Sequence, residues 1–351
     1  MTYPPEGCAE GWVGGGEGPQ PPLTRPPDFE SFWENTRAEL GRISPAVSRE
    51  SLGSEDLALE FERLSFASLG GDRVSGYAIR WKDDVPRPLV VHSHGYGGGL
   101  EPMRHWARMG LNVLGVEARR YGRSRDALPS LSPWGYVLTG IESPETHVLR
   151  GAVCDYMRAV EVGKEILDPF VSRTVLNGTS FAGGLAVMAE SILQVADFLV
   201  VAVPSFGWAE GRRLLVEDGS GQEINRYLEA HPEREEDVML VLSYFDSMNF
   251  AAAIRCPTLV GLGLEDSVVP APTVYAIVNH LSVPHQVVRL PVSHTDLPEE
   301  KLWDRFEAYW LRLVVEGVPP NFGENERGTQ VGDKTGVTKD EKDNVGEGGP
   351  N

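Results

Sequence analysis

The 351-residue sequence has few cysteines and no long apolar run. Cys8, Cys154 and Cys256 lie far apart without a C-x-x-C spacing. This pattern excludes a disulfide framework and a cysteine-based zinc site, and it suits a reducing compartment. No apolar run approaches the roughly 20 residues that a membrane-spanning helix needs. The first residues lack the charged start and apolar core of a secretion signal. We therefore expect a soluble, cytoplasmic protein.

Basic side chains are scarce relative to acidic ones. The sequence has 32 Lys and Arg against 51 Asp and Glu, a formal net charge of −19. Nucleic acids and anionic membranes attract proteins through basic surfaces. The charge balance therefore argues against nucleic acid and against a membrane as partners.

The composition changes at both ends of the chain. Residues 1–27 are rich in glycine and proline, and we expect an N-terminal extension that runs over the surface or packs on a neighbour. Residues 323–351 contain almost no apolar side chains, which predicts a disordered acidic tail. Residues 28–322 are long enough to bury a large core, and we predict one enlarged α/β domain there.

Eight short runs of β-branched and apolar residues alternate with helical patterns. The later runs are nearly continuous, as is typical of parallel strands covered on both faces. The clearest helical pattern starts at Ser143, which can cap it. Eight strands, the first antiparallel and the rest joined by helices, predict an α/β-hydrolase fold with a mostly parallel, twisted sheet of about eight strands flanked by helices. The runs cover residues 59–68, 73–81, 88–94, 111–118, 173–178, 197–203, 257–264 and 285–291.

Three of the later runs are followed by Ser180, Asp266 and His294, in that order. A histidine activates a serine hydroxyl best when a carboxylate fixes its tautomer, and α/β-hydrolases place the three residues in this chain order. Each residue alone also fits a structural role, as a small polar cap, a solvated helix start or a surface residue. The ordered set favours a catalytic triad, with Glu265 as a rival carboxylate at this point.

A glycine-rich loop, "VVHSHGYGGG" at residues 90–99, follows an earlier run. Hydrolases stabilise the developing oxyanion with backbone amides, one of them from the residue after the nucleophile. We therefore predict the backbone N–H groups of Phe181 and Tyr96 as the oxyanion donors.

Two other interpretations of this loop do not fit the sequence. A dinucleotide loop needs G-x-G-x-x-G, but Leu100 stands at the third glycine position. A metal site at His92 and His94 lacks the further ligands that should follow closely. We therefore expect no cofactor and no metal, and a structural role for one or both histidines.

From residue 26 to about Trp310 the sequence resembles the acetyl xylan esterase and cephalosporin C deacetylase family, carbohydrate esterase family seven. The resemblance implies that Ser180 is the nucleophile, His294 the base and Asp266, rather than Glu265, the acid. It also implies Tyr96 and Phe181 as the oxyanion donors. The strongest segments are residues 92–99, 135–161 and 244–281.

Three motifs depart from the family pattern. Residues 119–121 read "RRY" in place of R-G-Q, residues 178–184 read "GTSFAGG" in place of G-x-S-Q-G-G, and Thr295 follows the histidine in place of glutamate. We expect the Phe181 amide to donate despite the exchange, and Ala182 to be tolerated at a negative φ. The ring of Phe181 is expected to alter the pocket, and Tyr121 to pack differently from the family's glutamine. A pocket reshaped by both rings is the basis of the alternative hydrolase given below, so the departures concern specificity rather than the chemistry.

The resemblance implies a serine carboxylesterase that removes acetyl groups from small acetylated sugars or cephalosporin-type esters through an acetyl-enzyme intermediate. Family members form hexamers that use the segment before the nucleophile as an interface, so residues 130–145 imply a homo-oligomer, a hexamer by resemblance. Two alternatives remain. The chain is an α/β-hydrolase for a different or longer acyl ester, or a catalytically weak member retained for binding.

Overall fold

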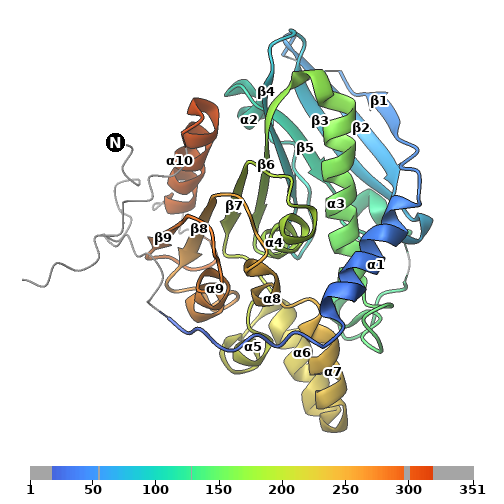
Figure 1. The fold of residues 1–351 in the computed structure, drawn as a ribbon, viewed down its shortest axis with the longest axis vertical. Helices are drawn as coiled ribbons and strands as arrows, with labels where there is room; N and C mark the ends of the chain where they lie inside the picture. The colour runs from blue at the N-terminus through green and yellow to red at the C-terminus, as the bar shows by residue number, and fades with distance from the viewer. Residues whose placement is uncertain (1–17, 54–55, 128, 296–300, 319–351) are drawn as a thin grey trace, which may run out of the picture.

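The structure is a computed structural model that describes residues 18–53, 56–127, 129–295 and 301–318. Its described part contains one nine-stranded sheet in the order β1-β2-β3-β5-β4-β6-β7-β8-β9 (Figure 1). The first three strands and β5 pair antiparallel, and β5, β4 and β6 to β9 pair parallel. The strands are β1 Ser48–Ser51, β2 Leu59–Ala67, β3 Arg73–Trp81, β4 Arg87–Ser93, β5 Asn112–Val116, β6 Val171–Thr179, β7 Phe198–Ala202, β8 Thr258–Gly263 and β9 His285–Leu290.

Helices cover both faces of the sheet. Helices α1, α3, α4 and α9 pack on one face, whereas α2 and α10 pack on the other (Figure 1). The helices are α1 Phe29–Gly41, α2 Arg104–Arg108, α3 Val148–Leu167, α4 Phe181–Leu193, α5 Ala209–Leu215, α6 Gly219–Ala230, α7 Glu235–Ser243, α8 Met248–Ala251, α9 Ala271–Val278 and α10 Leu302–Glu316.

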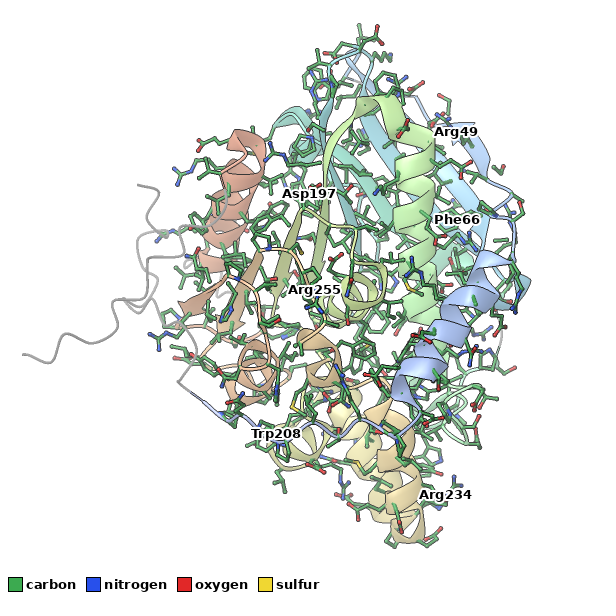
Figure 2. All side chains as sticks on the ribbon, viewed as in Figure 1. Arg49, Phe66, Asp197, Trp208, Arg234 and Arg255 are labelled. Atoms are coloured by element: carbon green, nitrogen blue, oxygen red, sulfur yellow. The ribbon has the colours of Figure 1, made fainter. Side chains whose placement is uncertain are left out.

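The alternation of side chains along each strand produces two hydrophobic cores. On β4, Leu89 and Val91 join the core beneath α3 and α4, whereas Val90 joins the core beneath α2 and α10. Side chains fill the space on both sides of the sheet (Figure 2). Strands buried on both faces must be apolar at every position, which explains the continuous apolar runs of the sequence. The predicted α/β-hydrolase architecture is confirmed.

A helical insertion separates β7 from β8. It contains α5, α6, α7 and the short α8, and its far end at Arg234 forms one end of the molecule (Figure 2). Asp218 caps α6, because its side chain accepts a hydrogen bond from the N–H of Gly219 at 2.7 Å. The insertion packs against the same core as α3 and α4.

The structure corrects two details of the sequence prediction. Strand β1 was not predicted, because all four of its residues are exposed and none is apolar. Helix α3 begins at Val148 and not at Ser143. Ser143 instead stabilises a preceding turn, in which its carbonyl accepts a hydrogen bond from the N–H of His147 at 3.1 Å.

Residues 18–28 run over the surface of the domain. Thr24 N–H donates to the side-chain oxygen of Asn249 at 3.0 Å, and Arg25 Nε donates to its carbonyl at 2.6 Å. The predicted extension over residues 1–27 is thus described only from Gly18 onward. The predicted tail over residues 323–351 lies outside the described residues. Among the described residues, no helix is long and apolar enough to span a bilayer.

Candidate active site

Ser180 lies in a sharp turn between β6 and α4. Its φ of 57° and ψ of −117° fall outside the regions that non-glycine residues prefer. A strained serine between a strand and a helix has the geometry of a nucleophile elbow, which exposes the hydroxyl above the sheet.

Glycine is required on either side of this turn, but not at the position of Ala182. A Cβ added at Gly178 would lie 2.2 Å from the carbonyl oxygen of Ala182, and one at Gly184 would lie 2.7 Å from the carbonyl oxygen of Ser205. Ala182 does not have a positive φ. The methyl group of Ala182 is therefore accommodated as the sequence predicted.

The hydroxyl of Ser180 has a second serine as its neighbour. The two Oγ atoms of Ser180 and Ser205 lie 3.4 Å apart, and the N–H of Ser205 donates to the Ser180 carbonyl at 3.0 Å. No hydrogen bond joins Ser180 Oγ to His294 within the described residues. Catalytic hydrogen bonds often form only in the complex with substrate, so the absence of this bond does not exclude Ser180 and His294 as a nucleophile and its base.

Asp266 and His294 form a hydrogen-bonded pair at the ends of β8 and β9. His294 Nδ1 lies 2.8 Å from Asp266 Oδ2, and the Asp266 side chain is fully buried. Asp266 Oδ1 accepts the backbone N–H groups of Val268 and Val269, each at 2.8 Å. The carboxylate is thus fixed on both oxygens and aligns the imidazole. Glu265, the rival carboxylate, is exposed.

Ser180 and His294 line one cavity of about 720 Å³. The cavity is bounded by the glycine-rich loop after β4, the elbow after β6 and part of α10. Parallel strands end at the same edge of a sheet, which explains why residues from distant positions converge there. Further lining residues include Tyr96, Met103, Trp106, Val268, Thr295, Trp303 and Trp310.

Both predicted oxyanion donors lie beside this cavity. Phe181 is the first residue of α4, so its N–H has no acceptor within the helix. Tyr96 lies in a tight turn closed by a 2.9 Å hydrogen bond from Gly98 N–H to the Gly95 carbonyl. None of the described residues accepts a hydrogen bond from the backbone N–H of Tyr96. Two unused amides next to a serine elbow are the arrangement that an oxyanion hole requires.

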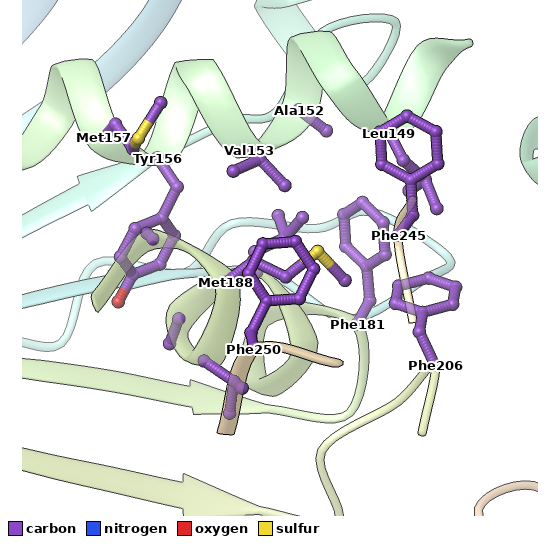
Figure 3. Packing of buried hydrophobic residues seen from close by; sticks show 14 of the residues in the cluster. Leu149, Ala152, Val153, Tyr156, Met157, Phe181, Met188, Phe206, Phe245 and Phe250 are labelled. Atoms are coloured by element: carbon purple, nitrogen blue, oxygen red, sulfur yellow. The ribbon is translucent and has the colours of Figure 1, made fainter. Parts of the chain in front are cut away.

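The expectation that the Phe181 ring alters the pocket is wrong, and the reshaping by Tyr121 that the alternative hydrolase needs is not seen either. Phe181 is fully buried, and neither ring lines the cavity. Figure 3 shows the Phe181 ring directed toward α3, near Leu149 and Phe206. Phe181 is the first residue of α4, and its side chain belongs to the core beneath α3 and α4 rather than to the cavity lining. Tyr121 packs 4.7 Å from the ring of Tyr136 and 6.0 Å from that of Phe181.

The two histidines of the glycine-rich loop have structural contacts. His92 is buried and its Nε2 lies 2.5 Å from the Tyr77 hydroxyl; burial lowers the pKa of His92 to about 3. His94 Nε2 accepts the N–H of Ala118 at 3.1 Å, which leaves Nδ1 as the donor to the Gly95 carbonyl. Burial lowers the pKa of His94 as well. Both imidazoles are neutral, His92 at the end of β4 and His94 in the loop, and their contacts agree with the structural role expected from the sequence.

The loop after β5 retains one residue of the family motif. Arg119 is buried and pairs with Asp155 on α3, with Nη2 to Oδ1 at 2.8 Å and Nε to Oδ2 at 3.1 Å. A further nitrogen reaches Asp72 at 3.1 Å. Arg119 therefore anchors this loop to α3 and to the turn before β3, while Tyr121 fills space among the rings of His94 and Tyr136.

The sheet order, the serine elbow and the Asp266–His294 pair define the chain as an α/β-hydrolase. The acetyl xylan esterase (AXE1) family matches residues 20–303. The chain therefore belongs to the acetyl xylan esterase family, whose members are carboxylic ester hydrolases.

Individual relatives agree with this assignment. An acetyl esterase of Xylanibacter ruminicola, Axe7A, is 20% identical over 313 residues, which are 85% of this chain and 69% of the relative. The solved acetyl xylan esterase from Paenibacillus sp. R4 is 25% identical with a TM-score of 0.76 over 84% of this chain and 97% of that one. Acetyl xylan esterase 1 from Thermoanaerobacterium sp. JW/SL YS485 shares the fold, with 22% identity and a TM-score of 0.75 over 84% of this chain and 96% of that one.

Sequence reasoning missed two polar neighbours of the site. Ser205 follows β7, and Glu223 on α6 accepts a hydrogen bond from the Tyr96 hydroxyl. Tyr96 and Glu223 are 127 positions apart, and neither belongs to a motif that links them. Only the placement of the insertion over the glycine-rich loop reveals this contact.

Proposed function

We propose that the protein is a serine esterase that removes acetyl groups from small acetylated sugars or cephalosporin-type esters, with Ser180, His294 and Asp266 as its catalytic triad. The observation that carries this proposal is the convergence of the Ser180 elbow and the Asp266-aligned imidazole on one cavity, in a member of an esterase family. Unused amides at Tyr96 and Phe181 support it.

The proposed reaction has two halves. Ser180 Oγ attacks the acetyl carbonyl carbon while His294 Nε2 takes the hydroxyl proton, and the N–H groups of Tyr96 and Phe181 donate to the oxyanion. The bond to the alcohol oxygen then breaks as His294 returns the proton to it. Water attacks the acetyl-enzyme with His294 again as the base, which releases acetate and restores the Ser180 hydroxyl.

Exchanging each of the two neighbouring serines tests the assignment of the nucleophile. We expect Ser180→Ala to reduce p-nitrophenyl acetate turnover to background. Ser205→Ala is the matched control, because Ser205 Oγ lies only 3.4 Å away but not on the elbow, and it should keep turnover within tenfold. Retained turnover in folded Ser180→Ala protein would overturn the proposal.

A panel of esters tests the substrate class. We expect kcat/KM to be highest for acetyl groups on short xylo-oligosaccharides or cephalosporin-type esters, and to fall for butyryl and octanoyl groups. The buried Phe181 ring supports this order, because it neither widens nor lines the cavity. A preference for octanoyl esters would contradict the proposed acetyl specificity.

The assembly state remains a prediction from family resemblance. We propose a homo-oligomer, with a hexamer as its form. Light scattering during gel filtration should then give about six times the 38.5 kDa mass of the chain. A monomeric mass in an active preparation would contradict this proposal.

A further inference from the structure

The side chain of Tyr96 connects the glycine-rich loop to two distant segments. Its hydroxyl donates to Glu223 Oε2 on α6 at 2.5 Å and accepts the backbone N–H of Val137 at 2.9 Å. Val137 belongs to the 3-10 helix Tyr136–Leu138, which precedes α3. One hydroxyl thus joins the oxyanion loop, the segment before α3 and the insertion between β7 and β8.

The segment before α3 is shaped to admit the Glu223 carboxylate. Gly135 has a φ of 130°, which L side chains rarely adopt. A Cβ at this position would lie 2.0 Å from Glu223 Oε2. Glycine at position 135 therefore satisfies two conditions at once, the backbone conformation and the space for the carboxylate.

The protonation states of Tyr96 and Glu223 keep the phenol as the hydrogen-bond donor and the carboxylate as the acceptor. Burial, followed by the hydrogen bond to Glu223, raises the pKa of the Tyr96 hydroxyl, so it keeps its proton. Burial raises the pKa of Glu223, while the hydrogen bond from Tyr96 opposes this change. The phenol therefore donates to the glutamate and still accepts from Val137.

We propose that Glu223 is a positioning residue for the oxyanion hole, because it holds the side chain of the residue whose backbone N–H faces the reacting carbonyl. This inference rests on the proposed function. The Gly95–Gly98 turn fixes the backbone on one side of Tyr96, and the Glu223 and Val137 bonds fix its phenol on the other. Because the backbone and the side chain of Tyr96 are both held, its N–H has a defined direction.

A misplaced Tyr96 N–H would weaken the stabilisation of the transition state. An oxyanion donor binds the developing charge more strongly than the ground-state carbonyl, and loss of one donor costs about 10²–10³ in kcat. A misplacement of about 1 Å costs about 10²-fold. Release of Tyr96 from Glu223 should therefore lower kcat and kcat/KM together, because the affected interaction is made only in the transition state.

The test uses three glutamate variants of the full chain with p-nitrophenyl acetate as substrate. We expect Glu223→Ala to lower kcat about 10- to 100-fold with KM changed less than threefold. Glu223→Gln keeps a carbonyl acceptor for the Tyr96 hydroxyl and should restore kcat to within about threefold of wild type. Glu229→Ala on the same helix is the matched control, because Glu229 is exposed, and it should leave kcat unchanged.

Gly135→Ala provides an independent test from another element. It should reproduce the kcat loss of Glu223→Ala, because the added Cβ displaces the same carboxylate, and the double variant should be no slower than either single one. Wild-type kcat in folded Glu223→Ala protein, or equal losses in Glu223→Ala and Glu223→Gln, would overturn the inference. Active Ser180→Ala protein would instead overturn the proposed function itself, so the two failures are distinguishable.

Discussion

Replacement of Asp266 by asparagine should abolish most activity without unfolding the protein. Asp266 Oδ1 accepts two backbone N–H groups at 2.8 Å, so the single carbonyl oxygen of asparagine is held at that position. The amide NH₂ then faces His294 Nδ1, which has to act as an acceptor. The proton consequently moves to Nε2, and the imidazole can no longer take the proton of Ser180.

The same exchange in a serine hydrolase triad lowers kcat about 10⁴-fold, which corresponds to about 5.5 kcal/mol of transition-state stabilisation. The assay is the kcat for p-nitrophenyl acetate at pH 7.5, with the urea midpoint as a measure of folding. Glu265→Gln, one residue away and exposed, is the matched control and should behave as wild type. A folded Asp266→Asn enzyme with more than a tenth of wild-type kcat would refute this account of the pair.

Three further predictions concern the core around the elbow. Burial raises the pKa of Glu190 to about 7, above its unfolded value, so its charged form destabilises the fold as the pH rises toward 7. Relative to wild type, Glu190→Gln should gain up to about 3 kcal/mol of unfolding free energy at pH 8 and nothing at pH 4, by urea unfolding; an equal effect at both pH values contradicts this.

Gly178→Ala should destabilise the protein and remove esterase activity, because its Cβ would lie 2.2 Å from a carbonyl oxygen, whereas Ala182→Gly should stay active at a cost of about 1 kcal/mol. Similar activities of the two variants would be inconsistent with the elbow geometry. Phe181→Leu should lower the unfolding free energy by about 1–2 kcal/mol and leave the acetyl-to-butyryl ratio of kcat/KM unchanged. A change in this ratio of kcat/KM values would indicate that the Phe181 ring lines the pocket, which contradicts the structure.

The sequence predicts the strands of the sheet well, because a run of apolar residues has one physical cause, the burial of its side chains. All eight predicted runs correspond to strands in the sheet. The later runs are nearly continuous because parallel strands buried on both faces need apolar side chains, whereas the half-buried, antiparallel β2 alternates apolar with polar residues. Strand β1 escapes notice, because an exposed edge strand of four polar or charged residues carries no apolar signal. The helix start at Ser143 was wrong, because a serine stabilises a tight turn as readily as a helix N-terminus.

The candidate site is predictable where chain order and strand ends determine position. Ser180, Asp266 and His294 each follow a parallel strand, and the sheet brings them to the same edge. The direction of the Phe181 ring is not predictable in this way, because it depends on how α4 is rotated against α3. The Tyr96–Glu223 contact depends on the docking of the helical insertion, which no local pattern specifies.

The central claim is that Ser180 is a nucleophile activated within this esterase fold. A fluorophosphonate probe reacts covalently with an activated serine, and mass spectrometry of the digested protein locates the modified residue. We expect one equivalent of label on Ser180, loss of esterase activity in proportion to labelling, and no label in the Ser180→Ala variant. A folded protein that stays unlabelled, or that is labelled at Ser205 instead, would contradict the account.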